Sequence, residues 1–327
     1  MSAKSATLHD VARAAGVSLI TASRALTNPK LVSEKTIARV QAAVQATGYI
    51  PNLLAGSLKS NRSRLVGGLV PALSVAQFLP TLQSLTDVLD GAGYQLMLGQ
   101  MRYDDSRQDA LLNAMIGRRV DGIVVTGLIR SEAARRQLVR LGTPVIETWD
   151  LTDRPLDIVV GFSHIKVGSA LAGYLLGKGY GRIGIATGDD HRAQLRREGF
   201  LATVGHNVPT AVVPAPSSLA LGRSALGELL RQDPALRAVA CSADQLAQGV
   251  IVEAQARGLR VPDDLAVCGF GNADFAAHIV PSLTTVHVDG ASIGRLAGEL
   301  IIARCSGETI RERVIDVGFE IVQRQSA

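Results

Sequence analysis

Short, almost continuously apolar segments alternate with amphipathic ones from residue 64 onward, and this rhythm limits the fold more than any other feature. The apolar segments predict strands at 65–70, 94–99, 121–126, 144–148, 157–161, 182–187, 238–241, 265–270 and 283–288. Stretches of helical spacing, such as 80–94 and 165–180, separate them. The alternation predicts parallel sheets covered by helices on both faces. So many strands exceed one compact sheet, so we expect two lobes with a ligand between them, beyond the carboxyl ends of the strands.

The first 50 residues read differently and predict a small all-helical unit. Residues 7–26, TLHDVARAAGVSLITASRAL, carry apolar side chains at helical spacing on either side of Gly16. Gly16 is suited to end the first helix in a left-handed conformation, and Ser18 to cap the second. Ser33 is expected to cap a third helix, EKTIARVQAAVQAT, which Gly48 ends. This pattern is a helix-turn-helix, although many helical hairpins of this kind never touch DNA.

The second helix is expected to leave Leu19, Ile20 and Arg24 exposed. Two aliphatic side chains in solvent need an explanation, and the DNA major groove supplies one. There, apolar groups contact thymine methyls, and an arginine forms two hydrogen bonds with guanine.

The basic excess is confined to the same part of the chain. Residues 1–64 hold nine Lys or Arg against two acidic residues, a net charge of +7, whereas the rest holds 25 basic and 27 acidic residues. This distribution is expected if the N-terminal unit alone meets phosphates. A solvated basic face is the alternative interpretation.

Composition excludes several other classes of protein. The 327 residues are enough for two or three domains. Cys241, Cys268 and Cys305 are too far apart to indicate a disulfide framework or a metal site. No signal peptide precedes MSAKSATLHD, and no apolar run reaches the roughly 18–20 residues of a membrane span. We therefore expect a soluble cytoplasmic protein without a metal or cofactor.

At residues 48–60, GYIPNLLAGSLKS, a family resemblance joins these patterns. With residues 7–26 and LVSEKTIARVQAA, this stretch resembles the headpiece and hinge of the lactose-repressor family of bacterial transcription regulators. The resemblance implies that Leu19, Ile20 and Arg24 read bases. It also implies a hinge helix from Ala55 to Leu58, with Leu58 entering the minor groove. The other implied DNA contacts are Thr7, Ser18, Thr21, Ser23, Ser33, Thr36, Tyr49 and Asn52.

The hinge can also be judged by its length. Residues 52–58 fall far short of the ~12–15 that an isolated helix needs, and Gly56 costs about 1 kcal/mol relative to Ala. We expect order only when two hinges pair across a homodimer on DNA. A plain linker, with its leucines packed on the core, is the alternative.

The resemblance continues over the core, which is similar to the periplasmic-binding-protein-like sensor of that family. It implies a headpiece at 1–50, a hinge and linker at 51–63, and an effector-binding and dimerisation core at 64–327. Lobe 1 would span about 64–161 and 290–318, and lobe 2 about 162–289 and 319–327. The family's anion-binding arginine falls on Arg196. Two positions depart from the family's pattern. The usual Asn-Asp pair reads Ala243-Asp244, and the usual Asp after the late strand is Gly271, followed by Asn272.

PVIETWD, LDIVVGF and VPALSVAQF resemble the gluconate-responsive branch, so we expect a sugar acid such as gluconate or 2-ketogluconate as effector. Its carboxylate would bind Arg196 through charge-assisted hydrogen bonds. The expected effector contacts are Ser74, Gln77, Phe78, Glu147, Trp149, Phe162, Arg196, Asp244 and Asn272. Arg196 as a surface charge and Trp149 as a core residue are the alternatives, and a neutral sugar or nucleoside is the alternative effector.

An enzyme and an exported binding protein are the competing classes. The chain has no Walker loop, HExxH or C-x-x-C motif. Cys241 has no identifiable histidine partner, so a buried structural thiol is favoured over a nucleophile. An exported protein would need a signal peptide and would not carry a basic headpiece. The sequence thus predicts a homodimeric repressor with an all-α headpiece and a two-lobed α/β core. The repressor is expected to bind a palindromic operator and to be released from it by an effector.

Overall fold

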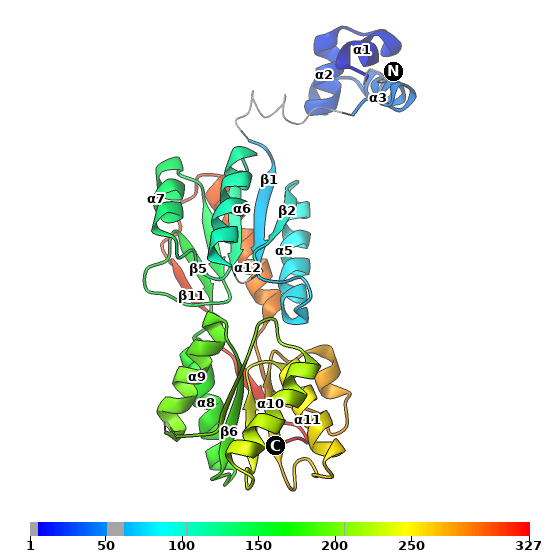
Figure 1. The fold of residues 1–327 in the computed structure, drawn as a ribbon. Helices are drawn as coiled ribbons and strands as arrows, with labels where there is room; N and C mark the ends of the chain where they lie inside the picture. The colour runs from blue at the N-terminus through cyan, green and yellow to red at the C-terminus, as the bar shows by residue number, and fades with distance from the viewer. Residues whose placement is uncertain (1–5, 51–61, 103, 206) are drawn as a thin grey trace. The chain divides into compact units, whose positions relative to one another are not determined.

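The computed structural model describes residues 6–50, 62–102, 104–205 and 207–327. The chain divides into two compact units, Met1–Ser63 and Arg64–Ala327 (Figure 1). The first is helical, and the second contains two largely parallel six-stranded sheets with helices around them. The predicted fold class, a helix-turn-helix headpiece and a two-lobed α/β core, is therefore confirmed.

The headpiece consists of three helices around a small apolar cluster. They are α1 (Leu8–Ala15), α2 (Leu19–Thr27) and α3 (Glu34–Thr47), with a single 3-10 turn at Pro29–Leu31. Val11, Ala25 and Val40 are buried where the helices meet. Gly16 and Gly48 end α1 and α3 with φ of 61° and 63°, the left-handed conformation that glycine adopts without steric cost.

The first lobe of the core is built on a parallel sheet of order β11-β5-β4-β3-β1-β2. Its strands are β1 (Leu65–Val70), β2 (Gln95–Gln100), β3 (Gly122–Thr126), β4 (Val145–Thr148), β5 (Ile158–Gly161) and β11 (Val314–Asp316). Its helices are α5 (Leu79–Gly91), α6 (Asp105–Gly117), α7 (Glu132–Leu141) and α12 (Gly290–Cys305). Val124 packs with α5 and α12, whereas Ile123 and Val125 pack with α6 and α7, so both faces of the sheet are covered.

The second lobe repeats this plan with a sheet of order β12-β10-β9-β8-β6-β7. Its strands are β6 (Ile183–Gly188), β7 (Thr210–Val213), β8 (Ala238–Cys241), β9 (Ala266–Phe270), β10 (Thr284–His287) and β12 (Glu320–Val322), of which β12 is antiparallel to β10. Its helices are α8 (His164–Gly177), α9 (His191–Val204), α10 (Leu219–Gln232) and α11 (Asp244–Ala256). Ile185 packs with α8 and α9, and Val239 with α10 and α11.

The nine predicted strands are all present, within two residues at either end. Strands β7, β11 and β12 were not predicted. Each is three or four residues long, lies at the edge of a sheet and has exposed or half-buried positions. Segments this short and this exposed carry too little apolar periodicity to be recognised in a sequence.

The chain passes between the lobes in three connections, after Gly161, after His287 and after Asp316. In each sheet the first strand, β1 or β6, has one neighbour on each side. The connections leave such a strand in opposite directions, which opens a crevice at its carboxyl end. In both lobes the carboxyl ends of the strands therefore lie at the crevice in which ligands bind in open α/β sheets.

Candidate functional site

Helix α2 presents the side chains that were expected to read bases. The Ser18 hydroxyl accepts the Thr21 amide at 3.1 Å and thereby caps the helix. Ala22 and Ala25 are buried. Leu19 and Ile20 remain 37% and 64% exposed, and Arg24 is exposed beside them. An aliphatic pair in solvent next to an arginine has the composition that major-groove readout uses.

The other side chains expected to contact DNA are exposed to different degrees. Thr7, Ser18 and Ser33 are exposed, whereas Thr21, Ser23, Thr36 and Tyr49 are half-buried. Ser33 is the N-cap residue of α3, as predicted, but its hydroxyl pairs with the Thr36 hydroxyl at 3.0 Å and accepts no backbone amide. Asn52, Ala55 and Leu58 lie outside the described residues.

A capping feature that the sequence analysis missed fixes the start of α1. The amide and the hydroxyl of Thr7 both donate to Asp10 Oδ2, at 2.9 and 2.7 Å. These bonds lower the pKa of Asp10, first of all through the hydroxyl. The threonine three residues before an acidic side chain was the available signal.

A cavity in the core brings four of the predicted effector contacts together. These four are Gln77, Phe78, Trp149 and Arg196, and the other lining residues are Val75, His164, Asp190, Arg192, Ala215, Ser217, Ser242, Ala243 and Gln245. The walls come from both lobes. Ser242 follows β8 and Asp190 follows β6, so the cavity lies beyond the carboxyl ends of these strands, as expected.

Arg196 is held in this cavity by two hydrogen bonds. Its Nη1 donates to His164 Nδ1 at 2.9 Å, and its Nη2 donates to the Ser242 carbonyl at 3.0 Å. Because a guanidinium only donates, Nδ1 accepts, and His164 Nε2 donates to the Trp149 carbonyl at 3.0 Å. The imidazole is therefore neutral. Burial, followed by the charge of Arg196, lowers its pKa well below the usual value.

Trp149 forms the apolar wall of the same cavity. It is buried, and its φ of 63° is rare for a bulky residue and concentrated at functional sites. Its ring makes edge contacts with Phe78 and Phe162, at centroid distances of 5.0 and 5.9 Å. Its Nε1 donates to the Thr81 hydroxyl at 2.9 Å. Phe78 and Trp149 thus give the cavity a rigid surface on which a carbon chain can pack.

A second cavity shares Asp190 and Arg192 with the first. Its other lining residues are Pro71, Met101, Asp104, Gln108, Thr126, Gly127, Leu128, Arg130, Asp150, Asp189, His191 and Gln194. Pro71, Asp150 and Asp189 directly or closely follow β1, β4 and β6. Burial raises the pKa of Asp150 and lowers that of His191. The two cavities therefore adjoin at the start of α9.

Glu147, a predicted effector contact, does not line either cavity. It is fully buried, and its two carboxylate oxygens accept the amides of Ile129 and Leu156 at 2.8 and 2.9 Å. Arg135 Nη1 lies 3.5 Å from Oε1. Burial raises the pKa of Glu147, while the two amide bonds and Arg135 oppose this. Its position joins the connection after β3 to the connection after β4.

Four more predicted contacts lie off the cavity walls. Ser74 is exposed just before Val75, and Phe162 is buried behind Trp149. Asp244 accepts the Ala273 amide at 2.7 Å and the Thr285 hydroxyl at 2.6 Å. The Asn272 side-chain oxygen accepts from Arg324 at 2.7 Å. These polar groups are used within lobe 2.

Sequence reasoning missed several polar residues of the first cavity, above all His164 and Arg192. Arg192 and Arg196 are one turn apart on α9, and Asp190, which caps that helix, accepts the Ala193 amide at 3.1 Å. Because α9 begins directly after β6, the strand-end rule applied to residues 189–196 could have found this set. His164 follows the crossover after β5 and carries no sequence signal of its own.

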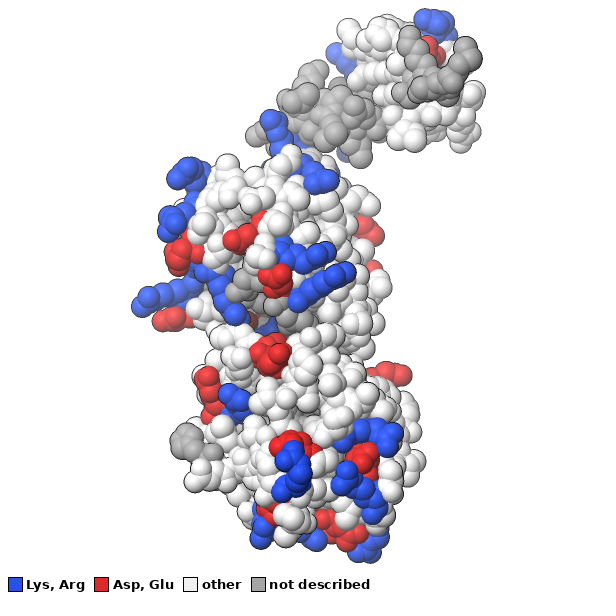
Figure 2. Space-filling view, in the orientation of Figure 1, with Lys and Arg blue, Asp and Glu red and all other residues white. Residues whose placement is uncertain are grey.

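The surface and the remaining reactive groups of the core are consistent with a binding protein. On the face drawn in Figure 2, acidic and basic side chains are interspersed over the core. Cys241 is buried between the sheet and α11, where burial raises the thiol pKa well above its usual value. In the part of the chain that the structure describes, no cluster of His, Cys, Asp or Glu could hold a metal ion. No helix among the described residues is both long and apolar enough to span a membrane.

Comparison with known proteins identifies the family. The profile described as "Bacterial regulatory proteins, lacI family" matches residues 7–52, and that described as "Periplasmic binding protein-like domain" matches residues 172–327. The chain is 36% identical to the HTH-type transcriptional regulator GntR of Pseudomonas aeruginosa, over 98% of this chain and 95% of that protein. It is 31% identical to the ribose operon repressor of Escherichia coli, over 98% of this chain and 100% of that protein.

A solved structure agrees with these sequence matches. A LacI-family transcriptional regulator from Silicibacter pomeroyi superposes with a TM-score of 0.91 at 34% identity, over 98% of this chain and 99% of that one. The chain therefore belongs to the lacI family of bacterial regulatory proteins and is a DNA-binding transcriptional repressor, not an enzyme.

Proposed function

We propose that this repressor controls sugar-acid catabolic genes in the cytoplasm and that a sugar acid such as gluconate or 2-ketogluconate releases it from its operator. The observation that carries the proposal is the setting of Arg196 in the first cavity. A carboxylate there would face the guanidinium groups of Arg196 and Arg192 beside a neutral His164. Asp190 is the acidic residue of that wall, and its Oδ1 is used to cap α9.

Charge and shape favour an acid over a neutral sugar. Charge-assisted hydrogen bonds between guanidinium and carboxylate are roughly twice as strong as neutral ones. The two bonds that hold Arg196 fix its plane, which reduces the entropy lost when an anion binds. Phe78 and Trp149 would cover the carbon chain. A neutral sugar, which the similarity to the ribose operon repressor suggests, would form only hydrogen bonds without charge pairing to the two guanidinium groups.

The headpiece would read a palindromic operator as one half of a homodimer. Leu19, Ile20 and Arg24 of α2 would contact base edges, since they are exposed next to one another. Two such helices bind half-sites about one helical turn, or ~34–36 Å, apart. The effector can release the operator only through a difference in its affinity for the DNA-bound and the free state. We assign the coupling to residues 51–63 from the sequence alone.

Calorimetric titration of the full chain with gluconate, 2-ketogluconate and ribose tests the effector. We expect the acids to bind, and Arg196→Gln to weaken them by at least about tenfold, because a charge-assisted pair is lost. Arg197→Gln is the matched control, since this neighbour lies outside both cavities. Binding of ribose without binding of either acid would refute the proposed effector class.

Fluorescence anisotropy with a labelled duplex, selected from a randomised pool, tests the release. The dissociation constant of the duplex should rise on addition of the acid that binds in calorimetry. Its affinity should also fall steeply with salt, because Lys and Arg of the headpiece displace counter-ions. An acid that binds without changing duplex affinity would contradict induction.

A further inference from the structure

The second cavity is lined by residues whose buried polar atoms have no hydrogen-bond partner among the described residues. We propose that it is a subsite for the uncharged, polyhydroxylated part of the effector, with Gln108, Asp150 and Arg192 as its hydrogen-bonding residues. The inference rests on the proposed sugar-acid function and deepens it. The effector becomes a monoanion whose carboxylate lies in the first cavity and whose hydroxylated chain extends past Arg192 into the second.

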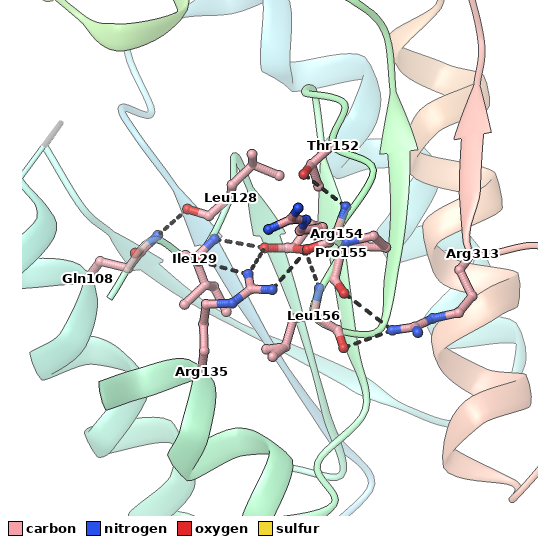
Figure 3. Close-up of polar contacts among 10 residues, drawn as sticks. Gln108, Leu128, Ile129, Arg135, Thr152, Arg154, Pro155, Leu156 and Arg313 are labelled. Carbon is pink, nitrogen blue, oxygen red and sulfur yellow. Dashed lines mark hydrogen bonds and ion pairs between the residues drawn. The ribbon is translucent and has the colours of Figure 1, made fainter. Parts of the chain in front are cut away.

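Gln108 on α6 is the first of these residues and is only 5% exposed. Its Nε2 lies 3.4 Å from the Leu128 carbonyl and 3.3 Å from Met101 Sδ (Figure 3 shows the first contact). Both neighbours are acceptors, so the amide nitrogen must face them and the oxygen must point away. Oε1 is buried and has no hydrogen-bond partner among the residues that the structure describes. Oε1 is thus an acceptor that a hydrogen-bond donor of a ligand in this cavity could use.

Hydrogen bonds around Glu147 hold in place the connection after β3, which contains Leu128, the partner of the Gln108 amide (Figure 3). Glu147 binds the Ile129 amide, and Arg135 donates to the carbonyls of Ile129 and Arg154 at 3.0 and 2.9 Å. Leu128 directly precedes Ile129, so its carbonyl is held in position for the Gln108 amide. A site whose supporting groups are already bonded loses little entropy when a ligand binds.

Asp150 and Arg192 supply the other two groups. Asp150 is 4% exposed, and its Oδ1 accepts the Leu151 amide at 3.0 Å. Its Oδ2 and Arg192 Nη1 are buried and have no hydrogen-bond partner within the described parts of the chain. The Arg192 guanidinium lies 5.4 Å from the centre of the Phe78 ring and lines both cavities. A ligand that occupies both cavities would therefore contact Arg192 with the middle of its chain.

The combination of groups selects hydroxyls. Buried polar atoms without partners cost free energy, which a ligand recovers if it satisfies them. Gln108 and Asp150 require donors, and Arg192 requires an acceptor. A hydroxyl both donates and accepts, so neighbouring hydroxyls on one chain can satisfy all three residues.

A second anionic group would be disfavoured in this cavity. The charged side chains that line it are Asp104, Asp150, Asp189, Asp190, Arg130 and Arg192, so aspartates outnumber arginines. A terminal carboxylate or phosphate would also present acceptors to Gln108 Oε1 and Asp150 Oδ2. The cavity thus discriminates aldonates from dicarboxylic and phosphorylated sugar acids.

The test is calorimetry on the full chain with three acids, namely gluconate, glycerate and glucarate. Glycerate keeps the carboxylate but lacks most of the hydroxylated chain, and glucarate carries a second carboxylate. We expect both to bind at least about tenfold more weakly than gluconate. Equal affinity for the three acids would overturn the subsite.

Two variants assign the residues. Asp150→Asn puts an amide N–H where Oδ2 accepts, and Gln108→Leu removes the amide. Each should lower the affinity for gluconate by about tenfold and change the affinity for glycerate by less than about twofold, because glycerate does not reach these atoms. Asp153→Asn is the matched control, since Asp153 is exposed in the same connection and outside the cavities.

The outcomes separate the two proposals. If the acids bind, but the variants leave gluconate unchanged or weaken glycerate as much, the second cavity is not a distinct subsite and the sugar-acid function stands. If none of the acids binds, both proposals fail.

Discussion

Helix α2, to which we assign base reading, and the two cavities, to which we assign effector binding, obtain their exposed side chains in different ways. In α2, Leu19, Ile20 and Arg24 lie within six positions and are exposed because the local helix period turns them away from Ala22 and Ala25. The first cavity draws on residues 75–78, 149, 164, 190–196, 215–217 and 242–245. Its geometry therefore depends on how distant segments pack. Function is set by local periodicity in the headpiece and by tertiary contacts in the core.

The contact between α8 and α9 illustrates the second case. A Cβ on Gly168 would lie 1.9 Å from the Arg196 carbonyl oxygen, and a Cβ on Gly199 would lie 2.0 Å from that of Ile165. The two helix backbones can touch only because both residues lack side chains. Since α9 carries Arg192 and Arg196, the proposed effector site depends on this close approach.

Gly168→Ala should have the largest effect of the changes considered. The added methyl must push α9 away from α8, and overpacking of this kind costs ~1–3 kcal/mol or more. Effector affinity should fall as well, because the guanidinium of Arg196 moves with its helix. Trp149, the chain's single tryptophan, lies in the core, so its fluorescence in a urea titration reports the free energy of unfolding of that unit.

Gly173→Ala on the same helix is the control, because nothing lies within 4 Å of the position that its Cβ would take. It should stabilise the core by about 0.5–1 kcal/mol through helix propensity. Equal stability losses in the two variants would show that the glycine contact does not hold the site together.

Arg24→Ala tests the headpiece side of the comparison. Loss of a two-bond contact with guanine should cost ~1–3 kcal/mol of operator affinity and relax base preference at one position. Stability and effector binding should stay unchanged, because Arg24 is exposed. Anisotropy titrations with the selected duplex and its single-base variants measure both effects. Arg13→Ala, an exposed arginine on α1, should leave base preference intact.

The same contrast explains what the sequence could predict. Gly16, Gly48 and the apolar period defined the headpiece helices, and nearly continuous apolar runs defined the inner strands, because each signal is local. Arg196 and Trp149 were found through a family resemblance. The helix that carries Arg196 was not itself predicted.

The polar residues of the cavities were harder to interpret. Glu147 and Asp150 are three residues apart, at the end of one strand, and both are buried acids. Glu147 is fully used by Ile129 and Leu156, whereas Asp150 keeps one oxygen unpaired among the described residues. Which acid faces a ligand depends on the amides that distant loops bring near, and no local pattern encodes that.

The neutral His164 predicts a pH dependence that belongs to the core. In the unfolded chain a histidine titrates near ~6.5, whereas burial and the charge of Arg196 keep the native imidazole neutral. Between the two pKa values the unfolded state binds a proton that the native state does not, so stability rises with pH. This contribution is complete above about pH 6.5 and is lost as pH falls, by at most ~1.4 kcal/mol per pH unit.

His164→Asn should remove that slope, as measured by urea titrations of Trp149 fluorescence between about pH 7.5 and 5.5. Arg192 and His191 also lower the pKa of His164 and remain in the variant. Burial raises the pKa of Glu147, Asp150 and Asp244, which makes stability fall with rising pH, but these groups are common to both proteins. Parallel pH profiles for the two proteins would mean that the imidazole titrates with the same pKa in the native and the unfolded state, contrary to its burial.

The smallest expected effect compares two serines of the headpiece that occupy the same position on different helices. The Ser18 hydroxyl accepts the Thr21 amide, whereas the Ser33 hydroxyl bonds only the Thr36 hydroxyl among its described neighbours. Ser18→Ala should therefore destabilise the headpiece by ~1 kcal/mol, and Ser33→Ala by less than about 0.5 kcal/mol. Hydrogen exchange at the buried amides of Val11 and Val40 measures both changes in the full chain. If the two variants were equally destabilised, the contribution of these N-cap serines to stability would come from their backbone preference and not from the side-chain hydrogen bond. The stability of the headpiece would then not follow from its local hydrogen bonds.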